Sequence, residues 1–461
     1  MVDIVRDVLA AVSDYGRVDL GKGRKAQVEF VSANPTGPLH VGHGRGAAVG
    51  DVTGNILSFA GWNVEKEYYV NDAGLQMNIL GRSTQSRYFE LLGRPEKFPF
   101  PEESYKGRYI YDIAQEVVDA RGEEFLERPL EESLPFFRTY AAGRILEQIK
   151  NELGEFGVTF DNFFSEKSLY DRNLVAAAVQ TLKERGHLYE QDEALWFRST
   201  EYGDDKDRVL MRSNGVPTYF TSDIAYHKEK FDRGFERVID VWGADHHGYV
   251  PRMKAAIEAL GYDPKKFTIL LIQFVNLLRD GEQVKMSTRS GQFVELQEVV
   301  REVGVDAARY YFLMRRSDSH LDFDLELAKS QSADNPVYYV QYAHARLCSI
   351  LQKAAEKGIA VPGVSAFDPD VIATPEEKRL FTKLAQFPEE VGRAAADLEP
   401  HRIVSYVYEL AGDFHSYYNN GGRILEESGA LRDSHLLMVA AIRTVIANAL
   451  RLLGISAPEK M

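Results

Sequence analysis

The stretch Val28-Glu-Phe-Val-Ser-Ala-Asn-Pro-Thr-Gly-Pro-Leu-His-Val-Gly-His43 decides the fold of this chain. Residues 27–32 are rich in residues that favour strands, and the Asn-Pro-Thr-Gly-Pro sequence after them is a turn cluster. Apolar residues then recur over 46–60 with the spacing of one helix face, and 64–70 returns to a strand pattern. This strand–helix–strand order predicts a parallel sheet.

The predicted secondary structure of the remaining chain changes near residue 330. Before that point, 76–186 is mostly helical, and the strand pattern resumes at 237–242 and 267–274, with a hairpin predicted at Asp280-Gly281. After that point only helical periodicity is found. The fold class predicted is α/β, with a doubly wound parallel-sheet domain followed by an all-α domain. The domain ranges predicted are 1–25 (helical remnant or linker), 26–330 (sheet domain, with a helical insertion at about 76–186) and 331–461 (helical domain).

Composition restricts the class of protein. The chain has 461 residues, a net charge of −14, 44% hydrophobic residues and one cysteine. A single cysteine, Cys348, excludes an internal disulfide and a Cys-rich zinc site. No apolar run approaches the roughly 20 residues that cross a bilayer, and the N-terminus has no signal-peptide pattern. These features predict a cytoplasmic protein with no membrane partner. The negative charge argues against a protein that coats nucleic acid through its overall field, but a local basic patch would suffice for a folded RNA.

Two histidines lie at the predicted junction of strand and helix, in Pro38-Leu-His-Val-Gly-His43. Backbone amides at a helix N-terminus are unpaired donors for phosphate, and glycine lets a nucleotide approach the backbone. Two histidines on one turn can donate to phosphate oxygens as charge develops. The alternative is that His40 and His43 only cap or pack the start of the helix.

A lysine-bearing loop follows the predicted hairpin, in Val284-Lys-Met-Ser-Thr-Arg-Ser-Gly291. A lysine there can supply positive charge where pyrophosphate leaves. An isolated Lys-x-Ser is more often a solvated loop. The order of the two motifs, histidines first and lysine late in the sheet domain, favours the catalytic interpretation.

These two segments resemble the HIGH and KMSK motifs of class I aminoacyl-tRNA synthetases. The wider match is to one family of that class, the arginyl-tRNA synthetases, and it covers nearly the whole chain. The matching segments are 28–37, 68–74, 217–225, 241–248 and 306–310. The resemblance implies a Rossmann-like class I catalytic domain with a helical insertion, followed by a helical anticodon-binding domain.

The resemblance also implies the reaction. The carboxylate of L-arginine attacks the α-phosphorus of ATP, bound with Mg²⁺, and gives arginyl-adenylate and pyrophosphate. The terminal ribose of arginine tRNA then takes the arginyl group through its 2′-hydroxyl and AMP is released. No side chain acts as a nucleophile, so catalysis comes from positioning and charge stabilisation. The expected partners are L-arginine, ATP and arginine tRNA, with no structural metal, and a monomer is expected.

Site residues follow from the same resemblance. The catalytic residues implied are His40, Gly42, His43, Lys285 and Ser287. The ATP-binding residues implied are Pro38, His40, Gly42, His43, Gly243, Asp245, His246, Lys285 and Met286. The arginine-binding residues implied are Glu29, Ser32, Asn34, Asp72, Tyr219 and Asp223. The anticodon-binding residues implied are Tyr339, Gln341 and Arg346.

Residue chemistry supports some of these roles and leaves alternatives open. Carboxylates match the planar guanidinium fork with charge-assisted bonds, and Tyr219 and Asp223 are one helical turn apart. Asp223 could instead cap a helix, and Glu29, in a predicted core strand, needs a cationic partner. Adjacent histidines after Asp245 are weak evidence for a metal site. Many of the aromatic and polar side chains of the helical domain must also serve its core.

Departures from the family pattern are few. Thr288 stands where the KMSK motif has its second lysine, and no lysine precedes the histidines in compensation. Family members begin with a separate domain that grips the tRNA elbow, whereas about 25 residues precede the first strand here. The competing functions are a sister class I synthetase, a small nucleotidyltransferase and a non-catalytic tRNA-binding paralog. The last is kept as the alternative, and the intact His40, Gly42, His43 and Lys285 argue against it.

Overall fold

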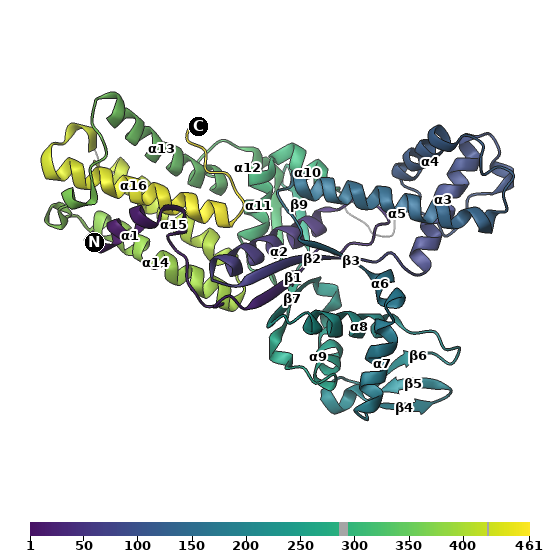
Figure 1. The fold of residues 1–461 in the computed structure, drawn as a ribbon. Helices are drawn as coiled ribbons and strands as arrows, with labels where there is room; N and C mark the ends of the chain where they lie inside the picture. Colours follow the sequence, from purple (N-terminus) through teal and green to yellow (C-terminus); the bar gives the residue numbers. More distant parts are fainter. Residues whose placement is uncertain (285–293, 422–423) are drawn as a thin grey trace.

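The computed structural model describes residues 1–284, 294–421 and 424–461. Lys285, Met286, Ser287 and Thr288 of the predicted lysine loop lie outside the described residues. The molecule is elongated, with a helical domain at one end, a parallel sheet in the middle and a helical lobe at the other end (Figure 1). A small antiparallel sheet lies below the parallel one in this view.

The central sheet has five parallel strands in the order β3-β2-β1-β7-β8. Helix α2 (Val41–Phe59) connects β1 to β2, and the chain then builds outward on both sides of β1. The topological switch point therefore lies between β1 and β7, where open α/β sheets bind their ligands. The predicted doubly wound sheet is confirmed. Its strands are β1 (Lys25–Glu29), β2 (Asn63–Val70), β3 (Asn162–Ser165), β7 (Arg237–Gly243) and β8 (Phe267–Ile272).

The region between β2 and β7 contains more strand than the sequence predicted. Helices α3, α4 and α5 form the projecting lobe around their own aromatic core, as expected from their periodicity. Strand β3 nevertheless joins the edge of the main sheet, and β4, β5 and β6 form a separate antiparallel sheet. These strands have only four residues each, so their pairing with distant partners, rather than local propensity, decides their structure. The elements are α3 (Leu75–Leu91), α4 (Arg108–Arg121), α5 (Leu130–Glu155), α6 (Glu166–Asp171), α7 (Leu174–Glu184), β4 (Leu188–Gln191), β5 (Ala194–Phe197), β6 (Arg208–Met211) and α8 (Tyr219–Asp232).

A second small sheet follows β8 and leads toward the helical domain. Its strands lie in the order β10-β9-β11, and the predicted hairpin at Asp280-Gly281 joins β9 to β10. Both turn residues have positive φ, which is the geometry of a tight hairpin turn. The elements here are α9 (Val250–Ala259), β9 (Val275–Arg279), β10 (Glu282–Gln283), α10 (Leu296–Val303), α11 (Val305–Leu313), β11 (Leu321–Asp324) and α12 (Leu325–Lys329).

The C-terminal domain is a helical bundle, as the periodicity predicted. Helix α16 forms its centre and packs against α13, α14, α15 and the N-terminal helix α1. Among the described helices, α16 alone is long and apolar enough to cross a membrane by length and composition, and 78% of the relevant window is buried in the bundle. That burial is the pattern of a core helix. The elements are α1 (Val2–Ala11), α13 (Pro336–Glu356), α14 (Pro375–Asp397), α15 (His401–Asn419) and α16 (Gly429–Leu452).

Helix α2 packs so closely on β1 that only glycine fits at one position. A Cβ built on Gly50 would lie 2.2 Å from Cγ of Phe30, whereas a Cβ on Gly46, in the same helix, meets nothing within 4 Å. We expect Gly50→Ala to lower the stability by about 1–3 kcal/mol through overpacking. Gly46→Ala should instead raise it by about 0.5–1 kcal/mol, because alanine loses less backbone entropy in a helix. Urea denaturation midpoints of the two variants test this, and equal shifts would contradict it.

Candidate functional site

The N-terminus of α2 is capped by two histidines that bond each other's backbone. The Nδ1 atom of His40 accepts from the amides of Gly42, at 3.1 Å, and of His43, at 3.4 Å. The Nδ1 atom of His43 accepts from the amide of His40 at 3.2 Å, and the two rings stack with centroids 3.6 Å apart. A Cβ on Gly42 would approach the His40 ring to 3.0 Å, so glycine keeps this cap compact.

This cap fixes the protonation of both rings. A ring nitrogen that accepts a hydrogen bond carries no proton, so each neutral imidazole has its proton on Nε2. Burial lowers the pKa of His43 to about 3, with a further contribution from His40, and burial also lowers the pKa of His40. At neutral pH the two rings therefore offer neutral N–H donors. The capping alternative and the phosphate-binding interpretation are compatible, because the cap orients the donors.

The chain leaves β1 in a strained conformation. Val31 and Ser32 have φ values of 65° and 40°, which non-glycine residues rarely adopt and which are concentrated at functional sites. The hydroxyl of Ser32 donates to Glu29 Oε1 at 2.9 Å and accepts from the amide of Tyr69 at 3.1 Å. Ser32 thus links the end of β1 to β2 by hydrogen bonds.

Glu29 has the cationic partner that its position requires. Its Oε2 atom lies 2.5 Å from Nζ of Lys230, which is fully buried and also lies 2.7 Å from Oδ1 of Asp240. Nε2 of His227 contacts the other oxygen of Asp240 at 2.7 Å. Burial raises the pKa of Glu29, and Lys230 opposes that shift. Both carboxylate oxygens of Glu29 already have hydrogen-bond partners, Lys230 and Ser32. This carboxylate therefore supports the neighbouring residues of the site.

A cluster of carboxylates lies near the end of β2 and the start of α6. Glu166, at the start of α6, is buried, and burial followed by the charges of Asp223 and Asp72 raises its pKa to about 7. Burial also raises the pKa of Asp223, whose Oδ2 accepts from the Tyr249 hydroxyl. Tyr69 lies among these groups, and its pKa is raised by burial and by the charges of Glu166, Asp223 and Glu29. Such closely spaced acids favour a cationic ligand.

Polar and aromatic side chains surround this cluster. The Tyr219 side chain, at the start of α8, is 60% exposed, and its hydroxyl lies 3.6 Å from the Cβ position of Gly74. Asp72 accepts from the Ser165 hydroxyl at 2.5 Å and from the amide of Lys167 at 2.9 Å, so it fixes the start of α6. Asn34 donates to Gln76 Oε1 at 2.7 Å. The structure thus brings the predicted arginine-binding residues to the ends of β1 and β2 and the first turns of α8, with Asp72 and Asp223 close to Glu166.

The carboxyl end of β7 carries the predicted ribose-side residues. A Cβ on Gly243 would lie 2.4 Å from Oδ1 of Asp245, whose exposed side chain would have to move aside. Asp245 and His246 form a pair at 3.6 Å, and their side chains are 64% and 62% exposed. In the described part of the chain no three His, Cys, Asp or Glu side chains gather as metal ligands. Their exposure leaves Asp245 and His246 accessible to a ligand at the switch point.

Comparison with known proteins agrees with this geometry. Residues 4–332 match the family model for the class I (R) tRNA synthetase catalytic domain, and residues 340–461 match the DALR anticodon binding domain. The arginine–tRNA ligase of Syntrophotalea carbinolica is 58% identical over 447 residues, which are 97% of this chain and 80% of that protein. This chain belongs to the arginyl-tRNA synthetases.

Solved structures of arginyl-tRNA synthetases have the same fold. A Campylobacter jejuni protein provisionally named as one aligns with a TM-score of 0.90 at 37% identity, covering 100% of this chain and 99% of that one. The Thermus thermophilus arginyl-tRNA synthetase aligns with a TM-score of 0.76 at 26% identity, covering 98% of this chain and 86% of that one. The class I catalytic fold and the helical DALR domain predicted from the sequence are confirmed.

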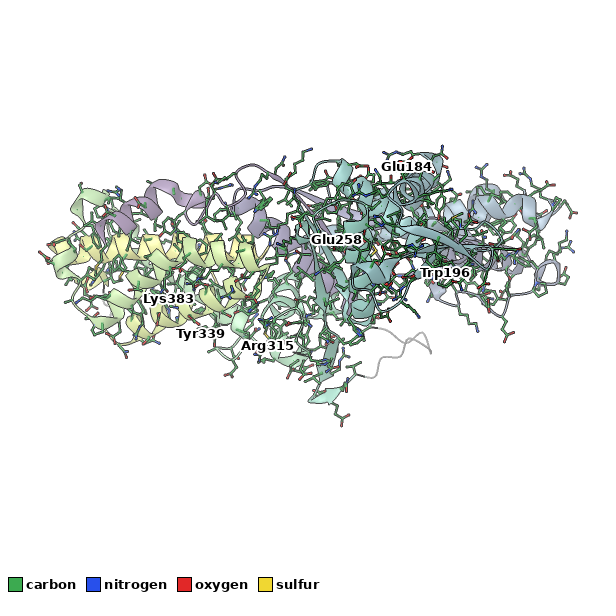
Figure 2. The ribbon with its side chains drawn as sticks, turned by 90° about the horizontal axis from the view of Figure 1, so that it is seen from below. Glu184, Trp196, Glu258, Arg315, Tyr339 and Lys383 are labelled. Carbon is green, nitrogen blue, oxygen red and sulfur yellow. The ribbon has the colours of Figure 1, made fainter. Side chains whose placement is uncertain are left out.

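The predicted anticodon residues have different surroundings. Gln341 is buried, and its amide donates to Asp306 Oδ2 at 2.8 Å and to the Ser456 carbonyl at 3.0 Å, which is a structural role. Arg346 lies over the ring of Tyr342, with 4.7 Å from its guanidinium carbon to the centroid, and borders a groove at the end of the bundle. Tyr339 lies at the edge of the helical domain (Figure 2). Tyr339 and Arg346 remain candidates, whereas the contacts of Gln341 turn it inward.

Two functional candidates were missed by the sequence analysis. Glu166 directly follows the four-residue strand β3, and Lys230 lies in the last turn of α8; neither belongs to a recognisable motif. Their significance comes from burial beside other charges, which periodicity does not reveal. For Lys230, the available signal was its spacing of one and two helical turns from His227 and Asp223 on the same helix face.

The histidine cap predicts that His43 does not titrate near neutral pH. Its pKa of about 3 means that the ring should stay neutral from about pH 5 to about pH 8. Histidine side-chain NMR on selectively labelled protein, with His43→Gln for assignment, should show a constant shift with the proton on Nε2. A sigmoidal shift of His43 in the same window would show that the cap does not hold.

Proposed function

We propose that this chain ligates L-arginine to arginine tRNA through an arginyl-adenylate. The observation that carries the proposal is that the carboxylates of Glu166, Asp223 and Asp72 gather near the carboxyl ends of β2 and β3, the same edge of the sheet at which the histidine-capped helix α2 begins. In this proposal the acidic cluster is the arginine pocket. The pocket suits a guanidinium, and the helix N-terminus suits the phosphates of ATP. A paralog without catalytic activity would have no need to keep the acidic cluster and the histidine-capped helix start at the same edge of the sheet.

Arginine would enter the pocket with its guanidinium toward the carboxylates. Asp223 and Glu166 supply the charge, and Tyr219 covers the open side. Asn34, Ser32 and Asp72 border the pocket and position the amino acid. Glu29 acts through Lys230 and Ser32, because both of its oxygens already have partners. This assignment places the arginine carboxylate toward α2, where the reaction occurs.

ATP would bind with its phosphates at the start of α2. His40 and His43 offer Nε2–H donors that stabilise the charge on the α-phosphate as the arginine carboxylate attacks. Gly42 and Pro38 keep this approach open, and Gly243, Asp245 and His246 are proposed to border the ribose. By resemblance, Lys285, Met286 and Ser287 act on the departing pyrophosphate. Mg²⁺ is proposed to arrive on the ATP phosphates, where it offsets their charge, and no resident metal is required.

The second step and the wider organisation are proposed on the same basis. The tRNA 2′-hydroxyl attacks the adenylate carbonyl, and AMP leaves. We propose 26–330 as the catalytic domain with the insertion at about 76–186, 331–461 as the anticodon-binding domain, and 1–25 as an N-terminal segment that packs on α16. Tyr339 and Arg346 would contact anticodon bases by stacking and by charge. A cytoplasmic monomer fits these roles.

The test is an aminoacylation assay with each of the twenty amino acids and total tRNA. Arginine alone should be charged, and pyrophosphate exchange should depend on arginine. Charging of another amino acid would support a sister synthetase. Tight binding of tRNA without any charging would support the non-catalytic alternative.

Asp223→Asn should weaken the use of arginine strongly and leave ATP binding nearly unchanged. A buried guanidinium that loses its carboxylate costs roughly 3–5 kcal/mol, because one charge is left unpaired. Inhibition by citrulline, which has the same shape without the charge, should change far less. Calorimetric titration of both compounds measures the difference. Equal losses for arginine and citrulline would place Asp223 outside the guanidinium pocket.

Glu166 should make arginine binding depend on pH. Its pKa of about 7, compared with an ordinary 4.5, means that it is mostly protonated in the empty pocket below pH 7. Because the shift is upward, its contribution to stability is complete below pH 4.5 and is lost as the pH rises through about 7. Arginine favours the ionised form, so its affinity should rise about tenfold between about pH 6 and about pH 8.

The variant Glu166→Gln isolates this effect. It should bind arginine more weakly and lose most of the pH dependence, leaving the smaller part that comes from Asp223. A matched control is Glu147→Gln on the exposed face of α5, which should behave as the wild type. An unchanged pH profile in Glu166→Gln would remove Glu166 from the pocket.

A further inference from the structure

The guanidinium of Arg45, in the second turn of α2, is fully buried and holds three backbone carbonyls. Its Nη1 donates to the carbonyls of Gln273 and Ser319, and its Nη2 donates to the carbonyl of Arg316, each at 2.8 Å. It makes no ion pair with a carboxylate among the described residues, and burial lowers its pKa to about 10. A buried charge is costly, so three well-aligned bonds indicate a specific structural task.

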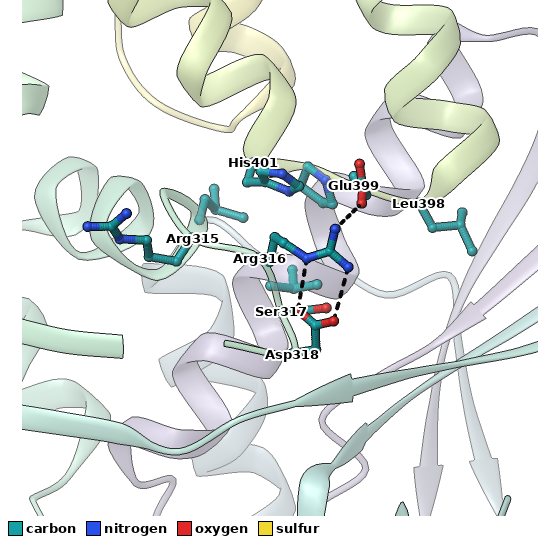
Figure 3. A pocket seen from close by; sticks show the side chains of 10 residues that line it. Arg315, Arg316, Ser317, Asp318, Leu398, Glu399 and His401 are labelled. Carbon is teal, nitrogen blue, oxygen red and sulfur yellow. Dashed lines mark hydrogen bonds and ion pairs between the residues drawn. The ribbon is translucent and has the colours of Figure 1, made fainter. Parts of the chain in front are cut away.

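That task is to hold the turn that leaves β8. Gln273 follows the last residue of β8, and its amide donates to the Ser317 carbonyl at 2.9 Å, so Ser317 and Arg45 bond the amide and the carbonyl of the same residue. The segment 316–319 is anchored in turn: Arg316 bonds both oxygens of Asp318 at 3.0 Å and reaches Glu399 at 3.0 Å (Figure 3). The turn therefore has a fixed backbone although it lies at the edge of the sheet.

The next residue in this fixed turn is Phe274, whose side chain is 62% exposed. An exposed phenylalanine on an immobilised backbone is costly in water and gives no core packing in return. Phe274 lies at the carboxyl end of β8, the edge that also carries Gly243 at the end of β7 and the start of α2. The ring is therefore presented at the ligand-binding edge of the sheet.

We propose that Phe274 is a stacking platform for the adenine of ATP and that Arg45 is the residue that positions it. The inference rests on the proposed function. Two strand spacings, about 10 Å, separate β1 from β8. The ribose and base of a nucleotide can span that distance when its phosphates lie at the start of α2. An aromatic ring stacks on any base through its π-face, and such a contact is worth a measurable part of the affinity.

The first test is Phe274→Ala, a surface change that should fold normally. Binding of a non-hydrolysable ATP analogue, measured by calorimetry, should weaken about tenfold, the size expected for loss of one base–aromatic stack. The KM for ATP should rise by the same factor, with kcat and the affinity for arginine nearly unchanged. Phe274→Trp should retain the wild-type affinity. Leu91→Ala, an exposed apolar side chain at the end of α3, is the matched control and should change nothing.

The second test separates positioning from general stability. Arg45→Lys leaves a cation but cannot hold three carbonyls at once. If Arg45 acts through Phe274, the KM for ATP of Arg45→Lys should rise by a factor up to that seen in Phe274→Ala. The double variant should then have the same KM for ATP as the more affected single variant. Arg309→Lys removes an equally buried guanidinium that bonds Asp51 and the Leu453 carbonyl instead. It should lower the thermal midpoint, and any rise in its KM for ATP should be smaller than that of Arg45→Lys, because Arg309 does not bond the segment that carries Phe274.

Three results would overturn the inference. An unchanged affinity of Phe274→Ala for the ATP analogue would show that the ring does not meet adenine. A rise in the KM for tRNA alone would show that it stacks on the tRNA 3′ end. Equal effects of Arg45→Lys and Arg309→Lys on the KM for ATP would reduce Arg45 to a stability role. Failure of the wild-type chain to charge arginine is a separate outcome, which would reject the proposed function itself.

Discussion

The buried pair of Asp51 and Arg309 is the interaction on which the arrangement of domains depends. Asp51 lies on α2, and Nη2 of Arg309 contacts its Oδ2 at 2.5 Å inside the protein. The same guanidinium bonds the carbonyl of Phe156 at 3.2 Å, after α5, and that of Leu453 at 3.0 Å, at the end of α16. One side chain therefore joins the helix of the active site, the base of the projecting lobe and the centre of the helical domain. Removing one partner of such a buried pair typically costs about 3–5 kcal/mol.

This junction explains why α2 can serve as a fixed reference for catalysis. A helix that offers its N-terminus to phosphates must not shift when a charged ligand binds. Helix α2 is held by Arg309 through Asp51, by Gly50 against Phe30, and by Arg45 against the turn after β8. Most of this helix is buried, and its histidine-capped end lies at the carboxyl end of β1. Preorganisation of the donors on His40 and His43 is a consequence of that burial.

Charge is distributed unequally around the same helix. At the base of the site, the single ammonium of Lys230 bonds both Glu29 and Asp240, which makes this buried network rigid. Beside the site, burial and the charges of Asp223 and Asp72 raise the pKa of Glu166, and burial raises the pKa of Asp223 although Lys230 opposes that shift. This imbalance of charge is the feature to which the proposed function assigns the selection of a cationic ligand. Arginine, with its permanent positive charge, is the amino acid that this imbalance favours.

The sequence by itself determined the parallel sheet, the histidine motif at the start of α2, the hairpin at Asp280-Gly281 and the helical C-terminal domain. Each is encoded locally, by periodicity, by turn residues or by a short motif. Only the tertiary structure decided that β3 joins the sheet, that Gln341 turns inward, and that Glu166 and Lys230 belong to the site. These outcomes depend on pairing and burial between segments far apart in the chain. The pKa of a carboxylate shifts when the fold buries it beside other charges. A local sequence pattern cannot predict that burial.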